Sequence, residues 1–105
     1  MLNKNLDKRL DIIKKDVLLE NAEKEFFNGY YETAATFFRN AGEHEKAKKC
    51  LILAAEQYIK KGSYSLAAML FEEIGMYEKA AECYKKIGKI EKEQEMYKKV
   101  GRKAV

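Results

Sequence analysis

Few side chains of this sequence could carry catalytic or metal chemistry. The 105 residues contain one histidine, His44, and two cysteines, Cys50 and Cys83. A histidine beside a cysteine can activate a nucleophile, and both residue types are ligands of zinc. However, no motif matches His44 to a Ser or Cys nucleophile, and the sequence has no P-loop, glycine-rich dinucleotide turn or HExxH motif. We therefore predict no enzymatic activity and no cofactor or metal, and we expect His44 to cap or pack the start of a helix.

The cysteines and three glutamates recur at fixed distances from glycines. Cys50 and Cys83 each stand eight residues after a glycine. This shared position indicates two small core residues rather than a redox or metal pair. Glu23, Glu56 and Glu82 each stand six residues before a glycine, a pattern that could suggest a carboxylate metal site. Because no histidine joins them as a ligand, we interpret them as solvated charges along one ridge.

Composition favours one helical, globular domain. The chain has 47% hydrophobic and 36% charged residues, no proline and six glycines. The apolar share argues against disorder, and the missing proline favours helix after helix. No apolar run approaches the ~18 residues of a membrane span, so we expect no membrane insertion. The start of the chain lacks the apolar core of a signal peptide and two cysteines make no disulfide framework, so we predict a cytoplasmic protein. Abundant Lys and Glu are typical of a thermophile.

The net charge of +4 is concentrated at the C-terminal end. Residues 76–105 contain nine basic residues and five glutamates, and the rest of the chain is neutral. Tyr84 and Tyr97 lie among these lysines, and surfaces that are basic and aromatic can bind single-stranded nucleic acid. Both tyrosines, however, occupy positions that the repeat assigns to the core. RNA binding is therefore the weakest alternative, and we interpret the lysines as a solvated cap.

The glycines show an internal repeat. They stand at positions 29, 42, 62, 75, 88 and 101, at intervals of 13, 20, 13, 13 and 13. Residues two, five, nine and twelve after each glycine are mostly apolar, and the fifth is alanine in four of the five segments. These offsets form one stripe along a helix of about three turns. Each glycine is expected to end a helix in a left-handed conformation.

The interval of 20 residues predicts one longer helix. Ala55 stands where a glycine is expected, so the helix that begins at His44 continues to about Lys61. The N-terminal helix, ending at Asn28, resembles this long helix when shifted by 33 residues. The other helices are predicted at 31–41, 64–74, 77–87 and 90–100. One domain, 1–105, then consists of three helical hairpins at about 5–41, 42–74 and 75–101.

Several repeat positions resemble the tetratricopeptide repeat. The runs from Gly29 to Ala41 and from Gly62 to Phe71 are similar to the second half of that repeat. Ala22, Ala55 and Ala81, each seven residues before a glycine, stand where the family has a small residue on its first helix. The resemblance implies an all-α, right-handed superhelix in a solenoid-like stack of six helices. The chain lacks the family's inter-repeat proline, and its third repeat has a first helix about two turns shorter. We therefore expect a compact stack of hairpins.

The resemblance also implies a binding surface, because the first helix of each tetratricopeptide hairpin lines the concave face. By matched positions this face carries Leu19, Glu23, Phe26 and Phe27, then Ile52, Glu56, Ile59 and Lys60, then Glu78, Glu82, Lys85 and Lys86. Leu19 and Glu23 replace the lysine and asparagine of the family's carboxylate clamp, so capture of a partner's C-terminal carboxylate is not expected.

An apolar strip edged by glutamates suits an amphipathic helix or peptide of a partner protein that has basic flanks. We therefore predict a non-enzymatic adaptor or scaffold module. The alternative is that these side chains pack internally or in a homodimer, as in a homo-oligomeric structural protein.

The two ends of the chain differ. Leu6, Leu10, Ile13 and Val17 form a second apolar stripe with 4-3-4 spacing, which either folds back on the first hairpin or mediates self-association. At the other end Glu93 replaces the repeated alanine, and the last helix is predicted to be a solubilising cap.

Overall fold

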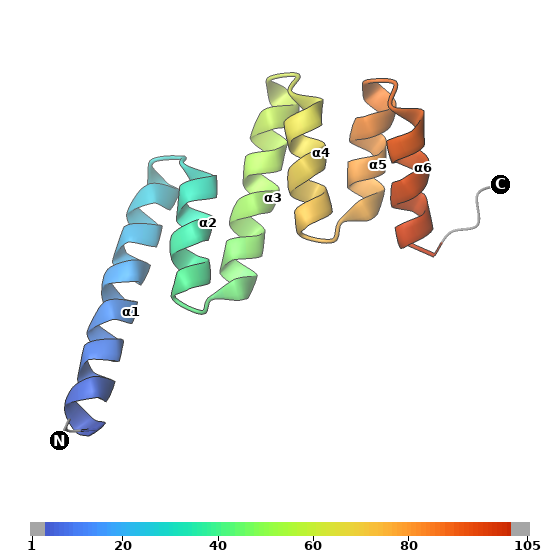
Figure 1. Cartoon of the computed structure of the whole chain (residues 1–105). Helices are drawn as coiled ribbons and strands as arrows, with labels where there is room; N and C mark the ends of the chain where they lie inside the picture. The colour runs from blue at the N-terminus through green and yellow to red at the C-terminus, as the bar shows by residue number, and fades with distance from the viewer. Residues whose placement is uncertain (1–3, 102–105) are drawn as a thin grey trace. The chain divides into compact units, whose positions relative to one another are not determined.

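The computed structural model describes residues 4–101, which form six α-helices joined by short turns (Figure 1). The helices are α1 (Lys4–Phe27), α2 (Tyr31–Asn40), α3 (His44–Lys60), α4 (Tyr64–Glu73), α5 (Tyr77–Lys86) and α6 (Ile90–Lys99). No strand occurs among these residues, so the all-α class is confirmed. Every helix ends one residue earlier than the glycine pattern predicts. The longer α3 and the shortened α5 are both as expected.

Glycine follows each helix because the turn requires a positive φ, and not because a larger side chain would clash there. All six glycines have positive φ, between 74° and 82°. A Cβ atom at any of them would meet nothing within 4 Å. In the five turns between helices, the residue after the glycine donates its N–H to the carbonyl five residues back, at 2.8 to 2.9 Å. The donors are Tyr30, Glu43, Ser63, Met76 and Lys89. This bond is the signature of the Schellman motif.

The same residue that closes one helix also begins the next. The carbonyl of Tyr30, for example, accepts the N–H of Ala34 at 2.9 Å, and the equivalent bonds follow the other four glycines. None of the residues before α2, α4, α5 and α6 uses its side chain to cap the helix. Because the backbone alone makes the turn, Tyr, Ser, Met and Lys are all tolerated at this position.

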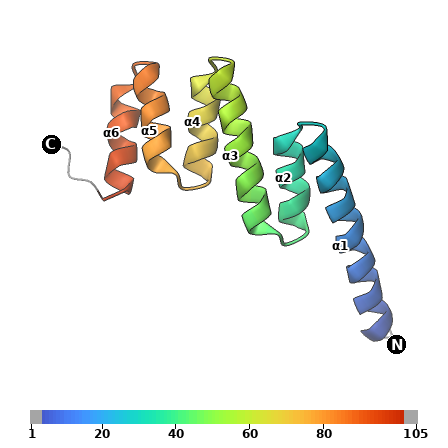
Figure 2. The same cartoon turned by 180° about the vertical axis from the view of Figure 1, so that it is seen from behind.

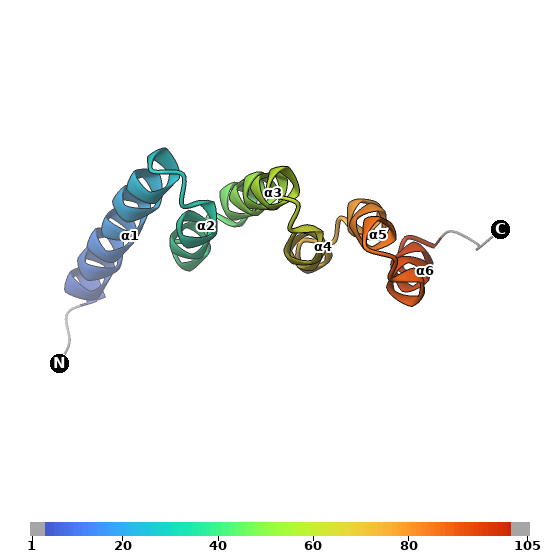
Figure 3. The ribbon, with the colours of Figure 1, turned by 90° about the horizontal axis from the view of Figure 1, so that it is seen from above.

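Contacts divide the chain into two units, residues up to 50 and residues from 51 on, and the boundary lies within α3. In the first unit α1 packs against α2. In the second unit α5 packs against both α4 and α6 and lies between them (Figure 2, Figure 3). The prediction of one domain with three hairpins stays a prediction.

Small residues allow the close helix contacts. Ala22, Ala55 and Ala81, which the sequence places at the helix crossings, have no exposed surface. Four alanines that follow the glycines by five residues are also buried: Ala34, Ala47, Ala67 and Ala80. An alanine lets two helix backbones approach without a cavity, so the repeat spacing correctly locates the core.

The N-terminal stripe is not covered by the chain's own hairpin. Leu6, Leu10, Ile13 and Val17 lie on α1 with 47 to 57% of their surface exposed. The expectation that the stripe folds back on the first hairpin is therefore wrong. His44, the first residue of α3, is exposed, so it does not pack in the core, and its expected capping role stays a prediction.

The last helix is buried less than its apolar pattern predicts. Met96 is fully buried and Tyr97 is half-buried, whereas Ile90 and Val100 are exposed. The neighbouring helix α5 covers only part of the apolar stripe of α6, the last described helix.

Candidate partner-binding surface

The first group of predicted binding residues lies on the C-terminal half of α1. Leu19 is half-buried, and Glu23, Phe26 and Phe27 are exposed. Their spacing places all four on one face of the helix. The Phe26 ring packs on Tyr31 of α2, with ring centroids 5.4 Å apart, and meets Phe27 edge-on at 6.0 Å. Phe27 itself is 83% exposed, the largest value among the exposed large hydrophobic residues of the range 4–101. Phe26 therefore supports the hairpin, while Phe27 is free to contact a partner.

The second group lies on α3 with the same spacing. Ile52 and Ile59 are half-buried, and Glu56 and Lys60 are exposed. The apolar members are therefore partly accessible, and the charged members stand in solvent. A helix surface with this alternation can contact an apolar side chain of a partner and can also select the charge of the residues beside that side chain.

The third group lies on α5 and is charged throughout. Glu82, Lys85 and Lys86 are exposed and line one open depression of about 450 Å³. Glu78 is also exposed and lies, with Lys79 and Val100, beside a separate depression near the start of α5. The structure thus places each group on one helix, the first in the unit up to residue 50 and the other two in the unit from residue 51.

A polar network joins three helices of the second unit, and sequence reasoning missed it. The hydroxyl of Tyr84 on α5 donates to Oε2 of Glu72 on α4 at 3.0 Å. The Nζ of Lys99 on α6 is 3.6 Å from Oε1 of Glu72 and 5.4 Å from the centre of the Tyr77 ring. Burial first, and then the hydrogen bond to Glu72, raise the pKa of Tyr84 to about 12. The only sequence signal was the tyrosine at a core position.

A second contact recurs in both units and also escaped the sequence. Lys46 lies over the ring of Phe38 at 5.8 Å from its centroid, and Lys79 lies over Phe71 at 5.9 Å. The two pairs are related by a shift of 33 residues. Each lysine stands four residues after a glycine, so the repeat contained the signal. These lysines cover buried aromatic rings, and their contacts with the rings stabilise the fold.

The two cysteines behave as core residues. Both are buried free thiols. Burial raises the pKa of Cys50, and burial together with the nearby Glu82 carboxylate raises the pKa of Cys83. A raised pKa keeps a thiol protonated at neutral pH, and the thiolate is the reactive form. This agrees with the prediction that they pack.

The two tyrosines among the C-terminal lysines differ in burial. Tyr84 is buried and hydrogen-bonded, and Tyr97 is half-buried. Lys92 pairs with Glu95 on α6 at 3.5 Å. Arg102 and Lys103, which contribute to the predicted basic cluster, lie outside the described residues.

Among residues 4–101, no group of three or more His, Cys, Asp or Glu side chains is placed to hold a metal ion. None of the helices in this range combines the length and the apolar character that crossing a bilayer requires. No family model, no curated protein and no solved structure matches the chain.

Proposed function

We propose that this chain is a non-enzymatic interaction module of tetratricopeptide-like repeats, stacked as a right-handed superhelix. Its partner is an amphipathic helix or peptide, which binds to helix faces that carry the groups of binding residues, on α1 in the first unit and on α3 and α5 in the second. The repeated glycine turn, the fully buried alanines and the recurrent lysine–phenylalanine contact support the repeat assignment.

One observation carries the proposal of binding. Phe27 projects 83% of its surface from a face on which Leu19 is half-buried and Glu23 is exposed. Phe26 fixes the neighbouring surface by packing on Tyr31. An exposed aromatic ring beside apolar surface is typical of an interface anchor. The exposed carboxylates of Glu23 and Glu56 favour a partner with basic residues beside its apolar face.

A pair of designed peptides tests this proposal. Both form amphipathic helices with the same apolar face, which is flanked by lysines in one peptide and by glutamates in the other. Fluorescence anisotropy measures their affinity for the full chain at low salt. We expect the lysine peptide to bind at least ~10-fold more tightly, because its lysines can pair with the exposed carboxylate of Glu23 on α1 or of Glu56 on α3. Free and amidated C-termini should bind equally, since the positions of the carboxylate clamp hold Leu19 and Glu23.

Variants assign the binding surface. Phe27→Glu should weaken the lysine peptide by about 10-fold or more. The control is Met69→Glu on α4, where an apolar side chain that is 57% exposed lies on the second helix of its predicted hairpin. Circular dichroism verifies that each variant keeps its helix content. Equal loss in both variants, or no preference between the two peptides, would contradict the proposal.

A further inference from the structure

The N-terminal half of α1 carries an apolar face that its own hairpin cannot reach. The face consists of Leu6, Leu10, Ile13 and Val17, all about half exposed. At 100° per residue, it is turned by about 120° from the side of α1 on which Ala22 is buried and Leu18 and Glu25 are half-buried. Shifting α2 along α1 would therefore leave this face in solvent.

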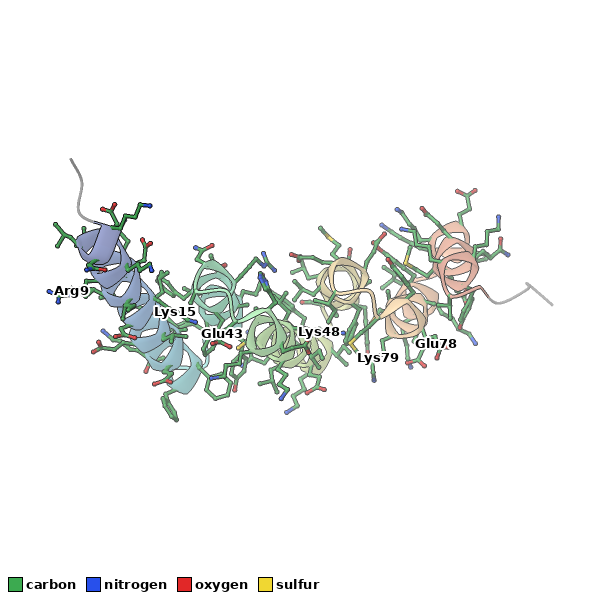
Figure 4. All side chains as sticks on the ribbon, turned by 90° about the horizontal axis from the view of Figure 1, so that it is seen from below. Arg9, Lys15, Glu43, Lys48, Glu78 and Lys79 are labelled. Atoms are coloured by element: carbon green, nitrogen blue, oxygen red, sulfur yellow. The ribbon has the colours of Figure 1, made fainter. Side chains whose placement is uncertain are left out.

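The 4-3-4 spacing of these residues is that of a coiled-coil seam. The four residues span about 16 Å of helix. Four charged residues flank the seam, Asp7 and Lys14 on one side and Arg9 and Asp16 on the other. All four are exposed, and none forms an ion pair with another described residue. Figure 4 shows Arg9 pointing away from α2. Lys15, by contrast, points toward Glu43, and its Nζ atom is 3.9 Å from Oε1 of that residue.

We propose that this segment, the α1 seam, pairs with the α1 seam of a second copy of the chain, with the two helices antiparallel. Leu10 then faces the partner's Ile13, and Leu6 faces the partner's Val17. The two-fold axis passes between the levels of Asp11 and Ile12. Each apolar residue thus meets another apolar residue, as a self-complementary interface requires.

The flanking charges select the antiparallel orientation. In this register Asp7 lies beside the partner's Lys14, and Arg9 lies beside the partner's Asp16. The two-fold axis repeats both pairs, so four opposite-charge pairs border the seam. In a parallel pair, residues five apart meet across the seam, so Arg9 would face the partner's Lys14 twice. One orientation therefore has four attractive pairs, and the other has two repulsive pairs.

The dimer is expected to be weak and dependent on concentration. Four side chains from each copy bury less than the ~1,200 Å² of a standard interface, so a dissociation constant on the order of 100 µM is expected. The α1 seam is distinct from the face that carries Phe27. Dimerisation goes beyond the proposed binding function and does not rest on it.

The first test measures mass against concentration. In sedimentation equilibrium at low salt, the mass should rise from 12.2 kDa toward twice that value between ~10 µM and ~1 mM chain. Ile13→Gln should weaken association by more than ~10-fold, since the seam loses two apolar residues per dimer. Ile12→Gln is the matched control, because Ile12 and Ile13 are 60% and 57% exposed on the same helix and only Ile13 lies in the seam. Ile13→Ala, which keeps high helix propensity, replaces the glutamine variant if circular dichroism shows lost helix.

The second test establishes orientation. Arg9→Glu places a glutamate beside the partner's Asp16, and Asp16→Arg places an arginine beside the partner's Arg9. Each variant alone should associate at least ~5-fold more weakly than wild type. An equimolar mixture should regain wild-type association, because both pairs become opposite in charge.

The outcomes are distinct. A chain that stays monomeric to ~1 mM, or an equal loss in Ile12→Gln and Ile13→Gln, overturns the proposed dimer. Stronger association of Arg9→Glu alone indicates the parallel pair, because its glutamate would then meet the partner's Lys14, and it overturns the antiparallel dimer.

Discussion

The two terminal helices share a pattern but use it differently. On α6 the apolar stripe is polar-edged, and its central residue, Met96, is fully buried. On the N-terminal half of α1 four apolar residues form a longer stripe, and every one stays about half exposed. A polar outer surface is expected where a helical repeat ends, and the role of α6 as a solubilising cap stays a prediction. Apolar periodicity therefore locates a face, whereas the neighbouring helix decides whether that face becomes core.

The largest expected effect separates the buried stripe from the exposed one. Met96→Ala should lower the free energy of unfolding by about 2–5 kcal/mol, because it opens a cavity at a fully buried site. Ile13→Ala should change it by less than about 0.5 kcal/mol when measured at low chain concentration. Urea unfolding followed by circular dichroism provides both values. Similar losses in the two variants would remove the distinction between the ends.

Replacing the glycine after α1 or the glycine before α6 should have an intermediate effect on stability, and the effect should be the same for both. Gly29 and Gly88 have φ values of 82° and 74°, and the space around both is open. Replacing either with alanine should cost about 1–2 kcal/mol, because only the left-handed backbone conformation is strained. Asparagine should cost less, since it tolerates this conformation. Thermal unfolding of the four single variants tests the equality. A much larger cost at one glycine would show that the turns are not equivalent.

The smallest effect concerns the polar network next to α6. Tyr84→Phe should lower the free energy of unfolding by about 1 kcal/mol, because Glu72 loses a hydrogen bond from a partly buried hydroxyl. The matched change at the other end, Lys15→Gln, breaks only the exposed 3.9 Å pair with Glu43 and should cost less than about 0.5 kcal/mol. Urea unfolding at neutral pH compares them, and an equal cost would contradict the assignment.

The same network predicts a pH dependence. The pKa of Tyr84 is raised from 10.0 to about 12, so the folded state binds the phenolic proton more tightly than the unfolded state. This contribution is fully present below pH 10 and is lost as the pH rises through about 12. In a phenolate absorbance titration of the wild type, a step at about pH 12 is expected, and Tyr84→Phe should remove that step.

Much of the local structure was predictable from glycine spacing. A glycine with positive φ ends a helix through bonds that depend only on the backbone, so helix ends could be located to within one residue. The alanine positions followed from the same spacing, because helices that touch need small residues at their crossings. The exposure of Ile90 and of the α1 seam could not be predicted in this way, since a periodic pattern does not say which neighbour is present.

The candidate surface was predictable only in part. The spacing of Leu19, Glu23 and Phe27 places them on one helix face, and any helix preserves that relation. Their different roles came from contacts: Phe26 packs on Tyr31, while Phe27 stays in solvent. The Tyr84 network was missed because Glu72 and Lys99 are 27 residues apart, with no local pattern that connects them.

The sequence by itself determined the six helices, their turns and the small residues between them, because these depend on interactions within a few residues of chain. Only the tertiary structure decided which stripe is buried, which aromatic ring is exposed and which charges meet. Those outcomes depend on side chains brought together from different helices, and on the surface that remains when packing within each unit is complete.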